Sequence, residues 1–119
     1  MAESKIQTDK VLLWTNPNPG AAMGDTTLSL DLSPYEFIEV WYQENGYGGV
    51  YKKALISIGV NSYIFGAAGG TTTRQFTTST SSIHIFQGMY YQAYGGNSAV
   101  YNNSVVLPLK IYGIRGNTN

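Results

Sequence analysis

The stretch 26–42, TTLSLDLSPYEFIEVWY, constrains the fold of this chain more than any other segment. Apolar residues hold every second position in each half, namely Leu28, Leu30 and Leu32, then Ile38, Val40 and Tyr42. Successive side chains of a strand point to opposite sides, so each half predicts a strand with one buried face. The corner at residues 33–36 contains a proline and predicts a turn that joins the two strands into a hairpin. A lone hairpin cannot bury its apolar face, so further strands must cover it.

The rest of the chain supplies strand candidates and no helix candidate, because β-branched and aromatic residues are plentiful between turn signals. The candidates are residues 10–14, 26–32, 37–42, 50–60, 61–66, 73–78, 82–87 and 104–114. We therefore predict an all-β fold, a single antiparallel β-sandwich of seven to nine short strands that is jelly-roll-like, with a small closed barrel as the alternative. Residues 1–9 are expected to be a flexible lead-in or junction, 10–116 the sandwich domain and 117–119 a tail.

Three local features refine this prediction. The Asn45-Gly46 pair within residues 43–49 is a strong signal for a hairpin turn. Pro108 cannot donate to a ladder, so the closing strand is expected to lie at an edge or to be broken there. The second face of the 37–42 strand carries Phe37, Glu39 and Trp41, which is too apolar for open solvent and is expected to meet another sheet or another subunit.

Charge and cysteine content exclude several classes of function. Only 12% of the 119 residues are charged and the formal net charge is zero, which argues against nucleic acid or an anionic membrane as a partner. All seven acids lie in the first 44 residues and five of the seven bases follow them, so the two parts attract across a contact or mix between interleaved strands. The absence of cysteine excludes disulfides, thiolate zinc sites and cysteine nucleophiles. No apolar run reaches the length of a membrane span, and residues 1–10 lack the apolar core of a signal peptide.

A catalytic constellation is not apparent. His84 is the single histidine and alternates with Ile83 and Ile85, so a surface or inter-subunit position is expected rather than a role as general base. Glu36 and Glu39 lie three apart and project to opposite sides of a strand, which does not make the carboxylate pair of a glycosidase. We therefore predict no catalytic residue, no metal site and no cofactor.

The positive functional signal is the tyrosine-rich segment 89–101. Tyrosine offers rigid amphipathic area, and Ser, Asn and Gly offer adaptable hydrogen bonding, a composition typical of recognition surfaces. Packing beneath a loop or against a subunit is the alternative reading. The residues expected to bind ligand are Tyr90, Tyr91, Tyr94, Asn97, Tyr101, Tyr47 and Tyr63. The residues expected at a subunit interface are Trp14, Phe37, Trp41 and His84.

Residues 10–19, 28–42 and 108–114 resemble small modules of tailed-bacteriophage and prophage tail proteins. Those modules combine a strand with Trp-Thr-Asn-x-x-Pro, a leucine-alternating strand and Tyr-x-x-Ile-x-Val. They close on a proline followed by Lys-Ile-Tyr-Gly-Ile. The resemblance implies a C-terminal or tip module of a tail fibre or baseplate receptor-binding protein, a virion component that is a homotrimer and contacts other tail proteins. It also implies assembly in the host cytoplasm.

Three functions follow from these observations. The main hypothesis is a receptor-binding domain that attaches the virion to host cell-surface polysaccharide without catalysis. The first alternative is a structural virion protein whose Tyr-rich segment mediates subunit contacts. The second alternative is a glycan depolymerase whose site is shared between subunits and uses Glu36, Glu39 or Asp31.

Overall fold

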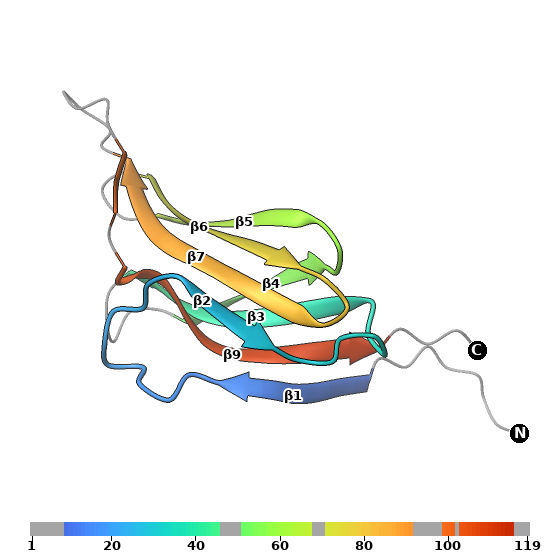
Figure 1. The fold of residues 1–119 in the computed structure, drawn as a ribbon. Coiled ribbons are helices and arrows are strands. Elements are labelled where there is room, and N and C mark those ends of the chain that lie inside the picture. The colour runs from blue at the N-terminus through green and yellow to red at the C-terminus, as the bar shows by residue number, and fades with distance from the viewer. Residues whose placement is uncertain (1–8, 46–50, 68–70, 92–98, 102, 116–119) are drawn as a thin grey trace, which may run out of the picture.

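A computed structural model describes residues 9–45, 51–67, 71–91, 99–101 and 103–115. These residues form nine strands in two antiparallel sheets with no helix among them, which confirms the predicted all-β sandwich (Figure 1). The strands are β1 (Asp9–Thr15), β2 (Thr26–Ser29), β3 (Phe37–Asn45), β4 (Tyr51–Ser57), β5 (Asn61–Ala67), β6 (Thr71–Thr78), β7 (Ser82–Tyr91), β8 (Ala99–Tyr101) and β9 (Val105–Arg115). Sheet A has the order β1-β9-β3-β4, and sheet B has the order β2-β7-β6-β5 with β8 paired to β7.

The core lies between the sheets and uses the faces that the alternation predicts. Leu32, Ile38 and Val40 are fully buried, and Tyr42 is 5% exposed. From sheet B they meet Ile83 and Ile85, which are also fully buried. His84 projects to the other side of β7, as the alternation predicts, and shares this outer face with its strand partners Thr27 and Thr77.

The predicted hairpin at 26–42 is wrong, because its two strands belong to opposite sheets. β2 pairs with β7 in sheet B, whereas β3 pairs with β4 and β9 in sheet A. After β2 the chain continues along the β6–β7 turn, since the amides of Leu30 and Leu32 donate to Ser81 and Thr80. It then crosses between sheets through a turn closed by the Tyr35 amide and the Leu32 carbonyl at 3.0 Å. The apolar faces of the two strands are thereby buried against each other in the core between the sheets.

β9 is a central strand of sheet A, so of the two outcomes expected at Pro108, an edge or a break in the strand, the structure has the break. The register of β9 against β3 shifts between Lys110 and Pro108, which is a bulge. β1 ends beside it, where the Asn16 amide group Nδ2 donates to the Pro108 carbonyl at 2.8 Å. The Asn16 backbone amide donates to the Leu109 carbonyl at 2.8 Å. The proline is therefore accommodated by a bulge, where a ladder donor is not needed.

Two predicted segment boundaries also differ from the structure. The strand expected at 50–60 ends at Ser57, because Gly59 adopts a φ of 97° and its amide donates to Thr78 Oγ1 at 2.8 Å. Only glycine adopts this backbone readily, so the chain turns here from sheet A to sheet B. The strand expected at 82–87 is longer, because β7 extends to Tyr91.

Gly113 on β9 is a point of close approach within the sandwich. A Cβ atom at this position would lie 2.8 Å from ring atoms of Tyr35. Tyr35 therefore packs flat on the backbone of the central strand, with the Arg115 guanidinium 5.6 Å from its ring centroid. This contact fixes the corner at 33–36 against sheet A.

Candidate functional site

The outer face of sheet B collects aromatic and polar side chains from three neighbouring strands. The register pairs Tyr63 with Gln75 across β5 and β6, and Thr73 with Phe65 on one side and Met89 on the other. Directly paired residues of an antiparallel sheet share a face, so these side chains form one surface.

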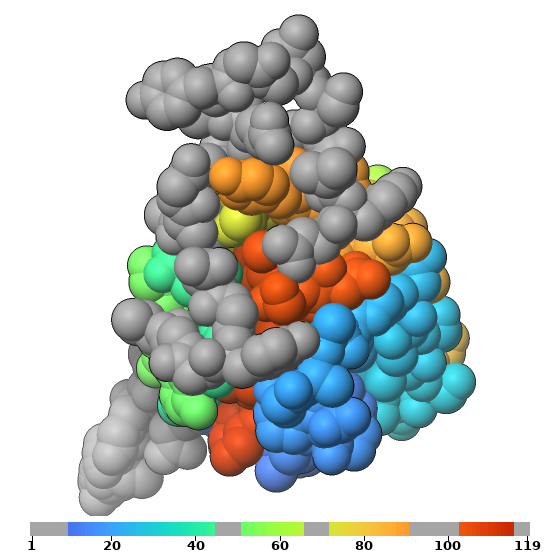
Figure 2. All heavy atoms as spheres, turned by 90° about the vertical axis from the view of Figure 1, so that its left-hand side faces the viewer, coloured from blue at the N-terminus to red at the C-terminus, as the bar shows by residue number. Residues whose placement is uncertain are grey.

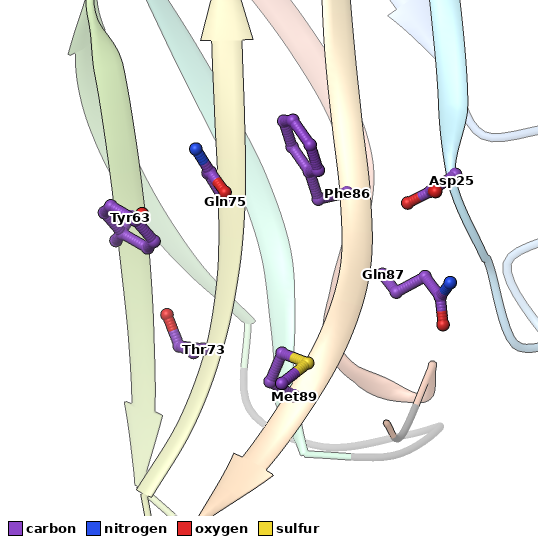
Figure 3. A pocket seen from close by; sticks show the side chains of 7 residues that line it. All are labelled: Asp25, Tyr63, Thr73, Gln75, Phe86, Gln87 and Met89. Atoms are coloured by element: carbon purple, nitrogen blue, oxygen red, sulfur yellow. The ribbon is translucent and has the colours of Figure 1, made fainter. Parts of the chain in front are cut away.

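This surface is hollowed into a pocket of about 280 Å³ (Figure 3). Its lining residues come from β5, β6, β7 and the segment before β2, namely Asp25, Tyr63, Thr73, Gln75, Phe86, Gln87 and Met89. The pocket is close to the lower end of the size range of small-molecule sites. It therefore has room for a compact polar ligand such as a single sugar ring.

Two exposed aromatic rings lie on this face at its edge strand, β5. Tyr63 and Phe65 are 56% and 62% exposed, and their ring centroids are 6.4 Å apart at an interplanar angle of 24°. Rigid aromatic rings held side by side offer flat apolar area at little entropic cost. The pair is thus suited to stack against the flat face of a ligand.

The polar groups of the pocket are mostly uncharged. Gln75 and Gln87 contribute amides, and Asp25 is its one charged lining residue. Thr73 lies at the base of the pocket, where its Oγ1 atom is buried and has no hydrogen-bond partner among the described residues. A buried hydroxyl without a partner is uncommon in folded proteins, and Thr72 Oγ1, which does not line the pocket, is a second one on β6.

Arg74 supports this surface from the inner side of β6. Its side chain is fully buried and donates to five backbone carbonyls at 2.8 to 3.3 Å, those of Met23, Phe86, Asn103, Val105 and Val106. Figure 2 shows this end of the molecule, where the start of β9 lies between β7 and the segment that precedes β2. A single guanidinium therefore joins both sheets and holds the segment that ends at Asp25.

The charge of Arg74 is stabilised mainly by dipoles. Burial lowers the pKa of Arg74 to about 10, and the negative charge of Asp25 opposes this shift. The group remains charged at neutral pH. Its carbonyl acceptors include that of Val106, whose φ of 44° is unusual for a β-branched residue. Sequence inspection missed Arg74, although its alternation with Thr73 and Gln75 places it on the same buried face as Phe76.

His84 lies outside the pocket on the same face of sheet B. Its Nδ1 atom is 2.6 Å from Thr27 Oγ1, and its ring meets Phe86 edge-on with centroids 4.3 Å apart. This half-buried position agrees with the expected surface histidine. Its role at a subunit interface stays a prediction.

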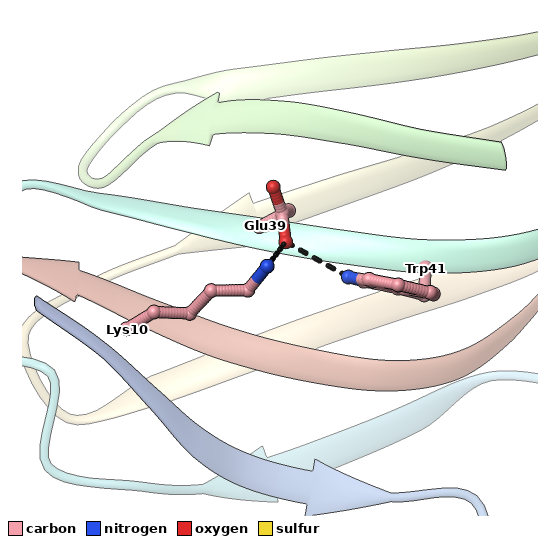
Figure 4. A network of polar contacts seen from close by, with 3 residues as sticks. All are labelled: Lys10, Glu39 and Trp41. Atoms are coloured by element: carbon pink, nitrogen blue, oxygen red, sulfur yellow. Dashed lines mark hydrogen bonds and ion pairs between the residues drawn. The ribbon is translucent and has the colours of Figure 1, made fainter. Parts of the chain in front are cut away.

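Trp41, Glu39 and Phe37 lie on the outer face of sheet A, where no other sheet of the described chain covers them. Glu39 Oε1 accepts from Lys10 Nζ at 2.9 Å and from Trp41 Nε1 at 2.8 Å (Figure 4). Burial raises the pKa of Glu39, but the hydrogen bonds from Lys10 and Trp41 and the charges of Lys10 and Lys53 outweigh it, so the pKa lies below its usual value. The carboxylate is ionised and held in place at neutral pH.

Trp14 is half-buried at the end of β1 and packs against the core. It also lines a second hollow of about 340 Å³, beside Pro17, Met23 and Leu28. Trp14 is expected at a subunit interface, and within one chain its ring packs against the core. Its contact with another subunit stays a prediction.

The structure brings only part of the predicted ligand-binding set to the pocket. Tyr63 lines it, whereas Tyr90 is half-buried and alternates with Met89, so it faces the other side of β7. Tyr91 and Tyr101 lie in β7 and β8, and their side chains are outside the described set. Tyr47, Tyr94 and Asn97 lie outside the described residues.

Neither a known protein nor a metal or membrane feature identifies this chain. The described residues contain no cluster of three or more His, Cys, Asp or Glu side chains that could hold a metal ion. Within the same residues no helix has the length and hydropathy needed to cross a bilayer. A scan against protein-family models, a search of curated proteins and a search of solved structures each gave no match.

Proposed function

We propose that this protein is a non-catalytic polysaccharide-binding domain that acts as the receptor-binding tip of a bacteriophage tail. In this role it attaches the virion to a neutral glycan on the host cell surface. The outer face of sheet B is its binding surface, with the pocket between Tyr63 and Phe86 at its centre. The tail setting rests on the resemblance of residues 10–19, 28–42 and 108–114.

The observation that supports the proposal is the combination of side chains in one hollow. Tyr63 and Phe86 provide ring surface, and the amides of Gln75 and Gln87 both donate and accept hydrogen bonds. Sugar rings present apolar C–H faces and hydroxyl edges, so rings and amides side by side match both. The one carboxylate, Asp25, accepts from hydroxyl groups and disfavours anionic sugars.

The state of Glu39 argues against a role for this residue as a general acid. A general acid needs a pKa raised toward neutrality, as in glycosidases. The pKa of Glu39 is lowered, and the same oxygen atom accepts from both Lys10 and Trp41. A Glu39→Gln variant tests the depolymerase alternative in an assay for release of reducing ends from host wall glycan. Activity that disappears in this variant would overturn the non-catalytic assignment.

The test of the proposal is binding of the fluorescently labelled domain to a panel of bacterial cells and purified wall glycans. We expect saturable binding to at least one glycan, which is lost in the double variant Tyr63→Ala/Gln75→Ala. The control is Tyr51→Ala, which removes an exposed ring from β4 in the other sheet. Binding that survives the first variant and is lost in the control would refute the assignment of the surface.

A further inference from the structure

The outer face of sheet A is unusually apolar for a solvent-facing sheet. Antiparallel sheets of sandwiches normally alternate apolar inner residues with polar outer residues. The register places these residues on the outer face: Lys10, Leu12, Phe37, Glu39, Trp41, Lys53, Leu55, Lys110 and Tyr112. Leu12 and Leu55, at opposite sides of this face, are 50% and 59% exposed.

The centre of this face is a fixed cluster of rings and charges. The rings of Trp41 and Tyr112 have centroids 6.0 Å apart. Lys10 Nζ lies 5.4 Å from the Trp41 ring and 4.9 Å from the Tyr112 ring, and Lys53 Nζ lies 5.1 Å from the Trp41 ring. Such contacts hold the tryptophan in one orientation before any partner arrives. Preorganised aromatic anchors ringed by polar groups are typical of the centres of protein interfaces.

The charges on this face are not balanced locally. Three lysines lie on it beside one acid, and that acid, Glu39, is paired with Lys10. The charge of Lys53 acts on Glu39 from a distance, but neither Lys53 nor Lys110 forms a direct ion pair with an acid among the described residues. The face is therefore positive on a chain whose formal net charge is zero.

The compensating acids lie at the corner that joins β2 to β3. Asp31 and Glu36 are exposed there, and neither pairs with a cation in the described part of the chain. The Asp31 carboxylate accepts hydrogen bonds from the hydroxyl and the backbone amide of Ser33. Both bonds lower the pKa of Asp31, and the hydroxyl bond has the larger effect. The corner is also held in place, because the Glu36 amide donates to Ile114 at 3.0 Å. The corner is therefore a fixed surface at one end of sheet A that exposes two acids, with the Arg115 guanidinium beside them on the Tyr35 ring.

We propose that the outer face of sheet A is an interface between copies of this chain. In this contact the apolar cluster around Trp41 is covered, and the Lys53 and Lys110 side of one copy meets the acidic corner of another. Glu36 lies five positions before Trp41, whose strand partner is Lys53, so the acidic corner and the lysines lie at different places along the sheet. Within one copy the acidic corner therefore does not meet the lysines. Between two copies the corner of one meets the lysines of the other. The contact is independent of the glycan-binding surface, which belongs to sheet B.

Sedimentation velocity over a concentration series tests this interface. Wild type is expected to associate, and the association should weaken as salt is raised, because exposed charges are screened. The variants Lys53→Glu/Lys110→Glu and Asp31→Lys/Glu36→Lys should each weaken self-association by about tenfold or more, since like charges then face each other. Far-UV circular dichroism and thermal melting show whether each variant is folded.

The decisive experiment is to mix the two charge-reversal variants. The first carries an acidic face and an acidic corner, and the second a basic face and a basic corner. Each is then complementary only to the other, so an equimolar mixture should associate while the separate variants remain monomers. A wild type that stays monomeric at all concentrations tested, or a mixture that does not associate, would overturn the proposal.

Discussion

The two outer faces of the sandwich carry similar residue types and differ in how the space above their rings is filled. On sheet A the stems of Lys10 and Lys53 reach over Trp41, and Glu39 closes the cluster. On sheet B the neighbours of Tyr63 are Gln75 and Thr73, which are too short to cover the ring. Long amphipathic side chains cover apolar surface, while short ones leave a hollow. The comparison indicates that the first face suits a flat macromolecular contact and the second a compact ligand.

Both faces depend on the same internal frame, so the largest expected effect comes from Arg74. We expect Arg74→Met to lower the free energy of unfolding by about 3–5 kcal/mol, because the carbonyls it serves lose their donor while buried. Chemical denaturation followed by tryptophan fluorescence measures this loss. Lys53→Met, at an exposed position, is the matched control. A loss of less than about 1 kcal/mol, the size of one ordinary hydrogen bond, would show that water replaces the guanidinium.

Gly113→Ala tests the contact that fixes the corner against sheet A. The added methyl would meet the Tyr35 ring at 2.8 Å, so we expect a cost of about 1–3 kcal/mol, typical of overpacking. The same substitution in a Tyr35→Ala background should cost less, because the clashing ring is absent. If Gly113→Ala lowers the free energy of unfolding equally in both backgrounds, the strain does not come from contact with the Tyr35 ring.

Tyr63→Ala sharpens the comparison at the level of binding. Truncation of an exposed ring at the centre of a binding surface should weaken glycan affinity about tenfold, or roughly 1.4 kcal/mol. Tyr51→Ala, which removes a similarly exposed tyrosine from β4, should leave the affinity unchanged. Titration calorimetry with the glycan identified in the cell-binding panel gives both values. A larger loss for Tyr51 than for Tyr63 would assign the ligand to sheet A instead.

The smallest expected effect belongs to the Lys10–Glu39 ion pair. A double-mutant cycle with Lys10→Met and Glu39→Gln should give a coupling free energy of about 0.5 kcal/mol at pH 7, because the lysine side chain is 39% exposed and solvent screens the pair. The folded pKa of Glu39 lies below its ordinary value of 4.5, so the coupling is present above that value. It is lost as the pH falls through the lower, folded pKa. Coupling that persists at pH 2 would contradict an ionic origin.

Much of the fold could be predicted from the sequence, because alternation reports burial directly. Ile38, Val40, Ile83 and Ile85 are buried as their spacing predicts. Alternation does not report which strand pairs with which, since that depends on contacts far apart in the chain. For this reason the 26–42 hairpin was wrong, and the sequence left open whether Pro108 marks an edge or a break.

The candidate site was harder to predict than the core. Tyr63 was expected to bind ligand and lines the pocket, but Gln75, Phe86 and Asp25 come from segments far apart in sequence. Their proximity follows from the order of strands in sheet B, which composition does not reveal. Arg74 had a local signal in its spacing from Phe76, yet its carbonyl acceptors lie in three separate segments.

Chemical-shift mapping by NMR tests the central claim most directly, because it reports on both faces in one titration. The unlabelled host glycan is added to the ¹⁵N-labelled domain, and the backbone amide shifts are followed to saturation. We predict that the perturbed amides cluster on β5, β6 and β7 around Tyr63, Gln75 and Phe86. Perturbations confined to β3 and β4 around Trp41, or none at saturating glycan, would contradict the assignment of sheet B as the glycan-binding face.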